Sequence, residues 1–123
     1  MKKFDNTSKS LELARKFLGQ TVNVTIDRPL GTKHPKHGFV YEINYGYING
    51  IQAPDGEDLD AYFLGVDEAI ESGEGVCIAI AHRLDDDDDK LIVVPVGRTL
   101  TDEEILRAIH FQEQWFKTII VRG

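Results

Sequence analysis

Acidic side chains are concentrated in two short segments of the sequence. Residues 55–60 (DGEDLD) carry four carboxylates and residues 85–89 are five consecutive aspartates, so these segments hold nine of the 21 acids. Carboxylates crowded together repel one another unless a cation lies between them. Hard divalent cations such as Mg²⁺ take oxygen ligands and often keep waters and substrate phosphates in their shell. The two segments together predict a site for divalent cations.

A third segment has the opposite charge. Residues 28–37 (RPLGTKHPKH) contain three basic residues and two histidines, and no acid. Such a loop next to a cation site would hold the phosphate of a substrate. His34 and His37 are spaced so that they could bind a transition metal, but contact with phosphate or solvent fits the basic loop better. The alternative is that the acidic and basic turns are merely solvated.

The spacing within the first acidic segment fits a metal cluster in a loop that enters a strand. Asp55, Glu57 and Asp60 stand at positions i, i+2 and i+5. An EF-hand is excluded, because it requires Gly at the sixth loop position and Glu at the twelfth, where this chain has Asp60 and Val66. The second segment offers further ligands and is followed directly by a cation, Lys90.

The elements that must position these segments are mostly strands. Strands are predicted over 21–27, 39–43, 48–53, 59–66, 76–81, 90–96 and 118–121, with turns at 44–47, at 54–56 and around Gly73 and Gly75. A short helix is predicted over 8–19. Thr101 and Glu104 have the form of a capping box, which predicts a helix from there to about residue 117. Without regular alternation of strands and helices, a small closed barrel fits better than a doubly wound parallel sheet.

Size and composition exclude several classes of protein. The 123 residues predict one domain, 1–123, and the single cysteine, Cys77, is expected to be a buried, inert thiol. The net charge of −7 disfavours a nucleic-acid binder. The first residues lack the apolar run of a signal peptide, and no stretch approaches the ~20 apolar residues of a membrane span. We expect a cytoplasmic protein without a membrane partner, and a homo-oligomer stays open.

Three aromatic residues near the C-terminus have two interpretations. Phe111, Trp115 and Phe116 lie in or just after the predicted helix. They could form a platform on which a ligand ring stacks, but packing in the core is the more common role of such residues. We expect them to be core residues.

Residues 22–95 resemble the soluble family I inorganic pyrophosphatases. The matching stretches are VTIDRP (24–29), YEINYGYI (41–48), DGEDLDAYFLGV (55–66) and DDDDDKLIVVPVG (85–97), and HFQEQWFK (110–117) matches more loosely. The order and spacing of these stretches agree with the family. The resemblance implies a mainly β fold: a small OB-type five-stranded barrel with a C-terminal helix and a short N-terminal helix.

The resemblance also implies a function and a site. The function is Mg²⁺-dependent hydrolysis of inorganic pyrophosphate to two phosphates by a metal-activated water. The magnesium-binding aspartates of the family fall on Asp55, Asp60, Asp85 and Asp88, and its metal-proximal glutamate falls on Asp27. Phosphate contacts are implied for Lys90, Tyr45, Tyr41, Lys117 and either Lys33 or Lys36, with Lys36 preferred on its spacing from Pro29.

Departures from the family pattern matter for catalysis. The candidate general base of the family is an Asp where this chain has Glu57, which keeps the carboxylate but moves it by one methylene. Glu57, Lys90 and Tyr45 are therefore the expected catalytic residues. A hairpin that normally supplies an arginine is missing, so Arg28 or Lys33 would replace it. The family's Tyr-Lys pair on the last helix reads Trp115-Phe116-Lys117 here, so the tyrosine hydroxyl is absent. The departures at Glu57 and Trp115 motivate an alternative substrate, a nucleotide or another organic diphosphate, and a non-catalytic OB-fold binding module is the further alternative.

Overall fold

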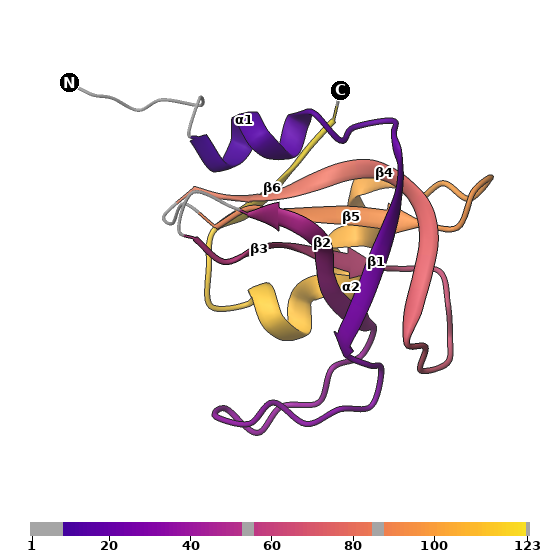
Figure 1. Cartoon of the computed structure of the whole chain (residues 1–123). Helices are drawn as coiled ribbons and strands as arrows, with labels where there is room; N and C mark the ends of the chain where they lie inside the picture. The colour runs from indigo at the N-terminus through magenta and orange to yellow at the C-terminus, as the bar shows by residue number, and fades with distance from the viewer. Residues whose placement is uncertain (1–8, 53–55, 85–87, 123) are drawn as a thin grey trace.

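The computed structural model describes residues 9–52, 56–84 and 88–122, which form two helices and six strands (Figure 1). The predicted metal ligands Asp55 and Asp85 therefore lie outside the described residues. The elements in chain order are α1 (Lys9–Arg15), β1 (Thr21–Arg28), β2 (Asn44–Gln52), β3 (Asp58–Phe63), β4 (Ser72–Arg83), β5 (Lys90–Val94), α2 (Asp102–Glu113) and β6 (Thr118–Val121).

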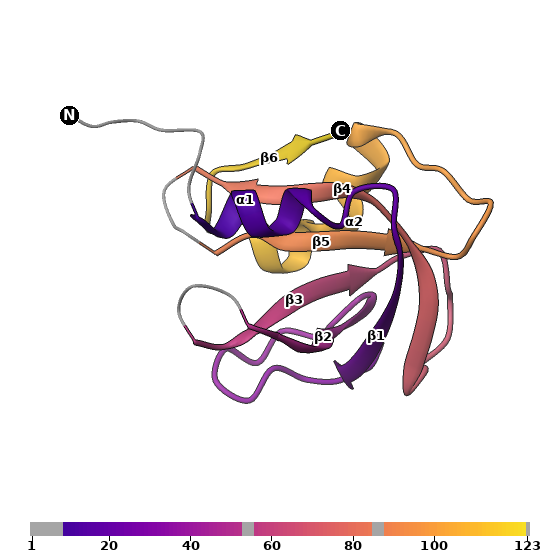
Figure 2. The same ribbon diagram turned by 45° about the horizontal axis from the view of Figure 1, so that its top comes forward.

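Five of the strands close into a barrel (Figure 2). Its strands are paired in the order β1, β2, β3, β5 and β4, and β4 returns to pair with β1. The β3–β5 pair is parallel and the other pairs are antiparallel. The short β6 adds to β4 outside the ring. This order confirms the expected OB-type five-stranded barrel, and closure removes the edge strands that an open sheet would expose.

The two helices pack on different sides of β5, which is buried on both faces. Leu91 and Val93 belong to one apolar cluster, which includes Leu11 of α1. Ile92 belongs to a second cluster with Ile105 of α2. A continuous apolar run such as residues 91–94 is typical of a strand that is covered on both faces. Figure 1 shows α1 above β4 and β5 and α2 below them. Cys77 is fully buried, as expected, and burial raises the pKa of its thiol to about 11.

The predicted turn at residues 44–47 is wrong, because these residues begin β2. Gly46 pairs with Ile26 of β1 and Ala61 of β3. A Cβ at Gly46 would lie 1.8 Å from the backbone oxygen of Thr25, so the glycine is required for close approach of two strands, not for a positive φ. The turn predicted around Gly73 and Gly75 is also wrong, because both lie within β4. A Cβ at Gly75 would lie 2.3 Å from the backbone oxygen of Val94 in β5, and a Cβ at Gly73 would lie 2.8 Å from the ring of Phe63.

Buried Asn44 fixes the start of β2 to two loops. Its side-chain oxygen accepts hydrogen bonds from the backbone N–H groups of Leu30, at 2.9 Å, and Ile70, at 3.2 Å. Its side-chain nitrogen donates to the backbone oxygen of Glu68 at 2.9 Å. Every polar atom of a fully buried amide needs such partners. The start of the loop that carries the basic residues is therefore held to β2 through Leu30.

The strand predicted at residues 39–43 is also wrong. Within this segment, Val40 makes a single isolated bridge with Lys33. The loop between β1 and β2 instead folds back on itself through backbone hydrogen bonds, from His34 N–H to the Phe39 oxygen at 2.7 Å and from Tyr41 N–H to the Thr32 oxygen at 2.8 Å. These bonds hold several aromatic side chains of the loop at fixed positions.

The capping box at the start of α2 is confirmed. The backbone N–H of Glu104 donates to the Thr101 hydroxyl at 3.1 Å, and the Thr101 N–H donates to the Glu104 carboxylate at 2.8 Å. The helix that starts here ends at Glu113, and Gln112 and Glu113 in its last turn contact residues of the barrel. In the described part of the chain, neither helix has the length and apolar character needed to cross a membrane.

Candidate active site

Strand register brings acidic and basic residues from distant segments to one end of the barrel. The parallel β3–β5 pair sets Ala61 opposite Leu91, so Asp60 and Lys90, one position earlier on each strand, are neighbours. Tyr45 of β2 pairs with Tyr62 of β3 and lies two positions from the partner of Asp60. The cluster is therefore a consequence of sheet topology.

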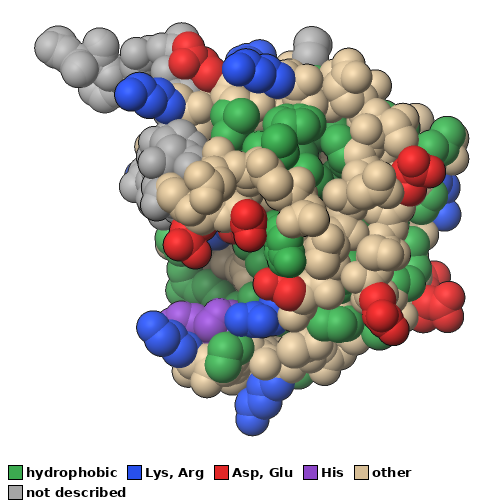
Figure 3. All heavy atoms as spheres, viewed as in Figure 1, with side chains coloured by type: hydrophobic (Ala, Val, Ile, Leu, Met, Phe, Trp, Pro, Cys, Tyr) green, Lys and Arg blue, Asp and Glu red, His purple; other side chains and the backbone are tan. Residues whose placement is uncertain are grey.

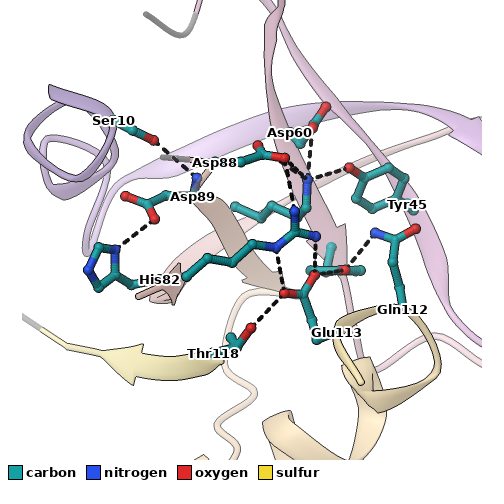
Figure 4. Close-up of polar contacts among 12 residues, drawn as sticks. Ser10, Tyr45, Asp60, His82, Asp88, Asp89, Gln112, Glu113 and Thr118 are labelled. Atoms are coloured by element: carbon teal, nitrogen blue, oxygen red, sulfur yellow. Dashed lines mark hydrogen bonds and ion pairs between the residues drawn. The ribbon is translucent and has the colours of Figure 1, made fainter. Parts of the chain in front are cut away.

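The ammonium of Lys90 is the centre of this cluster, and Figure 4 labels its partners Asp60, Asp88 and Tyr45. Its Nζ donates to Asp60 Oδ2 at 3.0 Å, to Asp88 Oδ2 at 3.3 Å and to the Tyr45 hydroxyl at 2.9 Å. The Lys90 side chain is 4% exposed, whereas those of Asp60 and Asp88 are 33% and 37% exposed. The two carboxylates thus hold a buried cation on one side and remain accessible on the other.

Electrostatics keep Lys90 charged and Tyr45 protonated. Burial opposes the charge on Lys90, but attraction to Asp60 and Asp88 outweighs it, so the pKa of Lys90 is raised. Burial, followed by the nearby Asp60 carboxylate, raises the pKa of Tyr45 well above its usual range. At neutral pH the cluster therefore offers an ammonium and a phenol O–H, both of which can donate to an anion.

A second ionic cluster lies beside the first and joins β4 to the end of α2. Arg83 donates from Nε and a terminal nitrogen to the two oxygens of Glu113, both at 2.9 Å, and from its other terminal nitrogen to Asp88 at 3.1 Å. Glu113 also accepts from Tyr62 at 2.5 Å and from Thr118 at 2.8 Å. Bidentate Arg–carboxylate pairs of this kind are stronger than hydrogen bonds between neutral groups.

The buried pair remains ionised despite desolvation. For Arg83, burial disfavours the charge, but its hydrogen bonds and attraction to Glu113 prevail and raise the pKa. For Glu113, burial favours the neutral acid, but the hydrogen bonds from Arg83 and Tyr62 prevail and lower the pKa below 4.5. The pair therefore fixes α2 against the barrel next to Asp88.

Neighbouring aspartates of the second acidic segment point in different directions. Asp88 faces Lys90, whereas buried Asp89 faces His82, with 2.7 Å between His82 Nδ1 and Asp89 Oδ1. The backbone N–H of Asp89 donates to the Ser10 hydroxyl of α1 at 3.0 Å. Burial is the main cause that raises the pKa of Asp89, and the hydrogen bond from His82 opposes it. Asp89 thus connects the segment to α1 rather than to the cleft.

A cavity of about 610 Å³ opens above Lys90. Figure 3 shows a hollow at the lower left, with acidic side chains above it and histidine and basic side chains below it. The floor is polar and one wall is aromatic. The lining residues are His34, His37, Phe39, Tyr41, Tyr45, Asp60, Arg83, Asp88, Lys90, Gln112, Trp115 and Phe116.

Five of the residues predicted from the sequence line this cleft together. They come from the loop after β1, from β2, β3 and β5, and from the segment before β5. Tyr41, although 3% exposed, stacks on Tyr45 with ring centroids 5.5 Å apart. The five are Tyr41, Tyr45, Asp60, Asp88 and Lys90.

Six other predicted residues are described but are not among the lining residues of the cleft. Lys33, Lys36 and Lys117 are exposed, and Arg28 is half-buried with a nitrogen 3.3 Å from the Asp27 backbone oxygen. Glu57 is exposed and comes just before β3. Asp27 is exposed at the end of β1, although partial desolvation of its carboxylate is the first cause that raises its pKa. Their roles stay predictions.

The metal ligands predicted from the sequence are brought together only in part. Asp60 and Asp88 meet at Lys90. Across residues 9–52, 56–84 and 88–122, no group of three or more His, Cys, Asp or Glu side chains is placed so that it could hold a metal ion. Asp55 and Asp85, the remaining candidates next to these segments, lie outside those ranges, so the full ligand set stays a prediction.

Sequence reasoning missed Arg83 and Glu113 and misjudged two aromatic residues. Arg83 ends an apolar run and Glu113 is the last acid of α2, and no spacing relates them along the chain. The core prediction is right for Phe111, which is 6% exposed. It is wrong for Trp115 and Phe116, which are 59% and 36% exposed. Both follow the last residue of α2 and line the cleft.

Comparisons with known proteins give a match in structure. No protein-family model matches the chain, and no curated protein matches it. The inorganic pyrophosphatase of Ehrlichia chaffeensis matches with a TM-score of 0.64 and 15% identity over 85% of this chain and 87% of that chain. The enzyme from Neisseria gonorrhoeae matches with a TM-score of 0.59 and 20% identity over 76% and 72%.

The inorganic pyrophosphatase of Helicobacter pylori covers more of the chain. It matches with a TM-score of 0.59 and 14% identity over 99% of this chain and 88% of that chain. At such identities the likeness shows the fold. The chain therefore has the fold of bacterial inorganic pyrophosphatases, which confirms the structural part of the resemblance found in the sequence.

The Arg83–Glu113 pair provides a stability prediction. We expect Glu113→Gln to lower the free energy of unfolding by about 3–5 kcal/mol at pH 7, because it leaves the buried Arg83 charge without its ion pair. The stabilisation by ionised Glu113 is fully present above pH 4.5 and is lost as the pH falls through its lower folded-state pKa. The difference between wild type and variant should therefore shrink below pH 4.5, as measured by urea denaturation.

Glu103→Gln is the matched control, since Glu103 is an exposed acid in the first turn of the same helix. It should cost less than about 1 kcal/mol at pH 7. Equal losses for the two variants, or a Glu113→Gln effect that is the same at pH 7 and at pH 3, would contradict a buried ion pair.

Proposed function

We propose that the protein hydrolyses a phosphoanhydride bond with the help of Mg²⁺, and that inorganic pyrophosphate is its minimal substrate. The observation that carries the proposal is the cluster of Lys90, Asp60, Asp88 and Tyr45 at the floor of a cleft. The shared fold of pyrophosphatases supports it. The residues that form the cluster belong to the sequence stretches that carry the resemblance to that family.

The residues present fit a magnesium ion. Asp60 and Asp88 offer carboxylate oxygens that are about one-third exposed on the cleft side. Arg83 contacts both Glu113 and Asp88, so the three carboxylates of Asp60, Asp88 and Glu113 face the two cations Lys90 and Arg83 and leave one net negative charge. Mg²⁺ is usually held by one or two carboxylates and keeps waters and substrate phosphates in its remaining positions. Asp27, Asp55 and Asp85 are proposed as further ligands.

Bound Mg²⁺ would lower the pKa of the water that it binds and would neutralise negative charge on the phosphate groups. The chain's own residues bind and orient the substrate. Lys90 and Tyr45 would donate hydrogen bonds to phosphate oxygens. Asp60 and Asp88 already hold the Lys90 ammonium in position for this contact. Arg28, Lys33, Lys36 and Lys117 lie outside the cleft lining; we propose that they contribute through their positive potential, which attracts the anionic substrate.

The reaction is simple in atoms and charge. A water oxygen bonds to one phosphorus while the bond from that phosphorus to the bridging oxygen breaks, and the water gives up a proton. Glu57 is proposed to accept this proton or to orient the water. Two phosphate groups result. No covalent enzyme intermediate is needed, so a nucleophilic side chain is not required.

A non-catalytic binding module on the same fold is less well supported. OB-type barrels that bind single-stranded nucleic acid combine aromatic side chains with a basic groove. Here the aromatic side chains lie beside Asp60 and Asp88, and the chain has a net charge of −7. Phosphate–carboxylate repulsion would oppose binding of a polyanion along this surface.

A phosphate-release assay with and without Mg²⁺ tests the proposal. We expect release from pyrophosphate to require Mg²⁺ and to fall by at least about 10- to 100-fold in Asp60→Asn, because the variant removes a charge from the proposed magnesium site. Asp67→Asn, an exposed aspartate outside the cleft, is the control and should retain wild-type turnover. Wild-type turnover in Asp60→Asn, or release without any divalent cation, would contradict the proposal.

Glu57→Gln tests the proposed base separately. Loss of a general base should lower kcat by about 10²–10⁴-fold, with a much smaller change in KM. Glu74→Gln, which replaces an exposed acid in β4, is the matched control. If Glu57→Gln only raises the Mg²⁺ concentration needed for half-maximal rate, then Glu57 is a metal ligand and not the base.

A further inference from the structure

The cleft has two chemically different ends. Its floor holds Lys90, Asp60, Asp88 and Arg83, where charged groups meet. Its other side is an aromatic wall, defined as His34, His37, Phe39, Tyr41, Trp115 and Phe116. The hollow in Figure 3 has histidine side chains at its lower border. A ligand that fills the cleft must therefore carry negative charge at one end and an apolar, planar group at the other.

The rings of the wall and of Tyr45 follow one another from the floor to the surface. Tyr45 lies 5.3 Å from Lys90 Nζ and 5.5 Å from Tyr41, measured from ring centroids. Phe39 lies 5.5 Å from Tyr41 and 5.6 Å from Trp115. These spacings are typical of packed aromatic pairs. The rings support one another, with Tyr41 buried among them at 3% exposed and Trp115 exposed at the far end of the row.

Most of the Trp115 side chain is exposed to solvent. It is 59% exposed although Phe39 and His37 pack beside it, with His37 at 6.4 Å. Phe116 has the Arg83 guanidinium 3.7 Å from the centre of its ring and is 36% exposed. Large aromatic groups left in water at the edge of a polar cleft are typical of a binding surface.

His34 in the wall has the geometry of a neutral ring. His34 Nδ1 accepts backbone hydrogen bonds from Lys36, at 3.0 Å, and His37, at 3.1 Å, so this nitrogen carries no proton. Desolvation, followed by repulsion from His37, also lowers the pKa of His34 below 6.5. At neutral pH His34 therefore presents an uncharged aromatic face to the cleft.

Inorganic pyrophosphate would use only the floor. It carries no apolar surface that could contact Trp115 or Phe39. The volume of about 610 Å³ falls within the range of roughly 300–1,000 Å³ that is usual for sites of organic ligands. A larger substrate, with a phosphoanhydride attached to a planar ring, would fill both ends.

We propose that the cleft recognises a nucleoside diphosphate, with the base against Trp115 and Phe39 and the phosphates at Lys90. This inference rests on the proposed phosphoanhydride hydrolysis and names its substrate class. In the reaction a water oxygen bonds to the terminal phosphorus, and the bond from that phosphorus to the bridging oxygen breaks. The products are a nucleoside monophosphate, inorganic phosphate and a proton.

Two non-hydrolysable probes of equal charge separate the contribution of the nucleoside to binding from that of the phosphates. One is α,β-methylene-ADP and the other is the methyl monoester of methylenediphosphonate, both with Mg²⁺. Trp115 is the only tryptophan of the chain, so its fluorescence reports contact at the wall. We expect the nucleotide analogue to quench this fluorescence and to bind about tenfold more tightly than the methyl ester, the order of magnitude of one base stacked on an aromatic ring.

Variants of Trp115 test whether the aromatic wall causes the tighter binding of the nucleotide analogue. By calorimetry, Trp115→Leu should reduce the ratio of the two affinities about tenfold, and Trp115→Phe should restore most of it because the ring returns. Leu106→Ala, at a 39% exposed position of α2 away from the lining residues, should leave the ratio unchanged. A reduced ratio in Trp115→Leu that Trp115→Phe does not restore would contradict stacking.

The inference and the proposed function fail in different ways. If pyrophosphate is hydrolysed with Mg²⁺ but the nucleotide analogue binds no more tightly than the methyl ester, the nucleotide proposal is overturned and the hydrolase proposal stands. If the nucleotide analogue binds preferentially and quenches Trp115 but no phosphate is released from any phosphoanhydride, base recognition stands and hydrolysis is overturned. Equal binding of the two probes without quenching overturns the inference in every case.

Discussion

The buried ammonium of Lys90 is the constraint on which the candidate site depends. A charge that is 4% exposed requires compensation, and it receives it from Asp60, Asp88 and the Tyr45 hydroxyl. These partners come from β2, β3 and the segment before β5, so pairing the charge fixes three parts of the chain relative to one another. Removing one partner of such a cluster is costly, because the remaining buried charge is left uncompensated. The same arrangement leaves two carboxylates accessible from the cleft.

A second constraint determines the shape of the cleft. The Arg83–Glu113 pair holds the C-terminal end of α2 against β4, and Asp88 connects this pair to Lys90. Trp115 and Phe116 follow Glu113 by two and three positions, so their position at the rim is a consequence of that anchor. Beside them, backbone hydrogen bonds of the β1–β2 loop hold His34 and Phe39, and Phe39 packs on Trp115. The polar floor and the aromatic wall are thus built by different elements and meet at Tyr45.

The sequence predicted those features that depend on local pattern or on a recognisable motif. The buried run of β5, the alternation of β1 and the capping box of Thr101 each have a signal within a few residues. Asp60, Asp88 and Lys90 could be grouped because charged segments flank strands and because the motifs resemble a known family. The predicted turn at Tyr45 failed because the glycine beside it serves close strand contact, which no local pattern reveals.

Features that depend on contacts between distant residues could not be predicted. Arg83 and Glu113 are 30 positions apart and pair because α2 packs on the barrel. Asp88 and Asp89 are chemically identical neighbours, yet one faces the cleft and the other faces α1, because successive side chains of an extended segment point to opposite sides. Trp115 was expected in the core, since its type favours burial; the end of α2 instead places it at the rim.

Binding of Mn²⁺ followed by NMR tests most directly whether the carboxylates beside Lys90 hold a divalent cation. Mn²⁺ accepts the same oxygen ligands as Mg²⁺, and its unpaired electrons broaden signals of nearby nuclei. At substoichiometric Mn²⁺ we expect the amide signals of Asp60, Asp88 and Lys90 to broaden first and to recover when excess Mg²⁺ is added. Broadening that begins at the exposed acids of α2, Asp102 to Glu104, and spares Asp60 and Asp88 would contradict a cation site at the floor of the cleft.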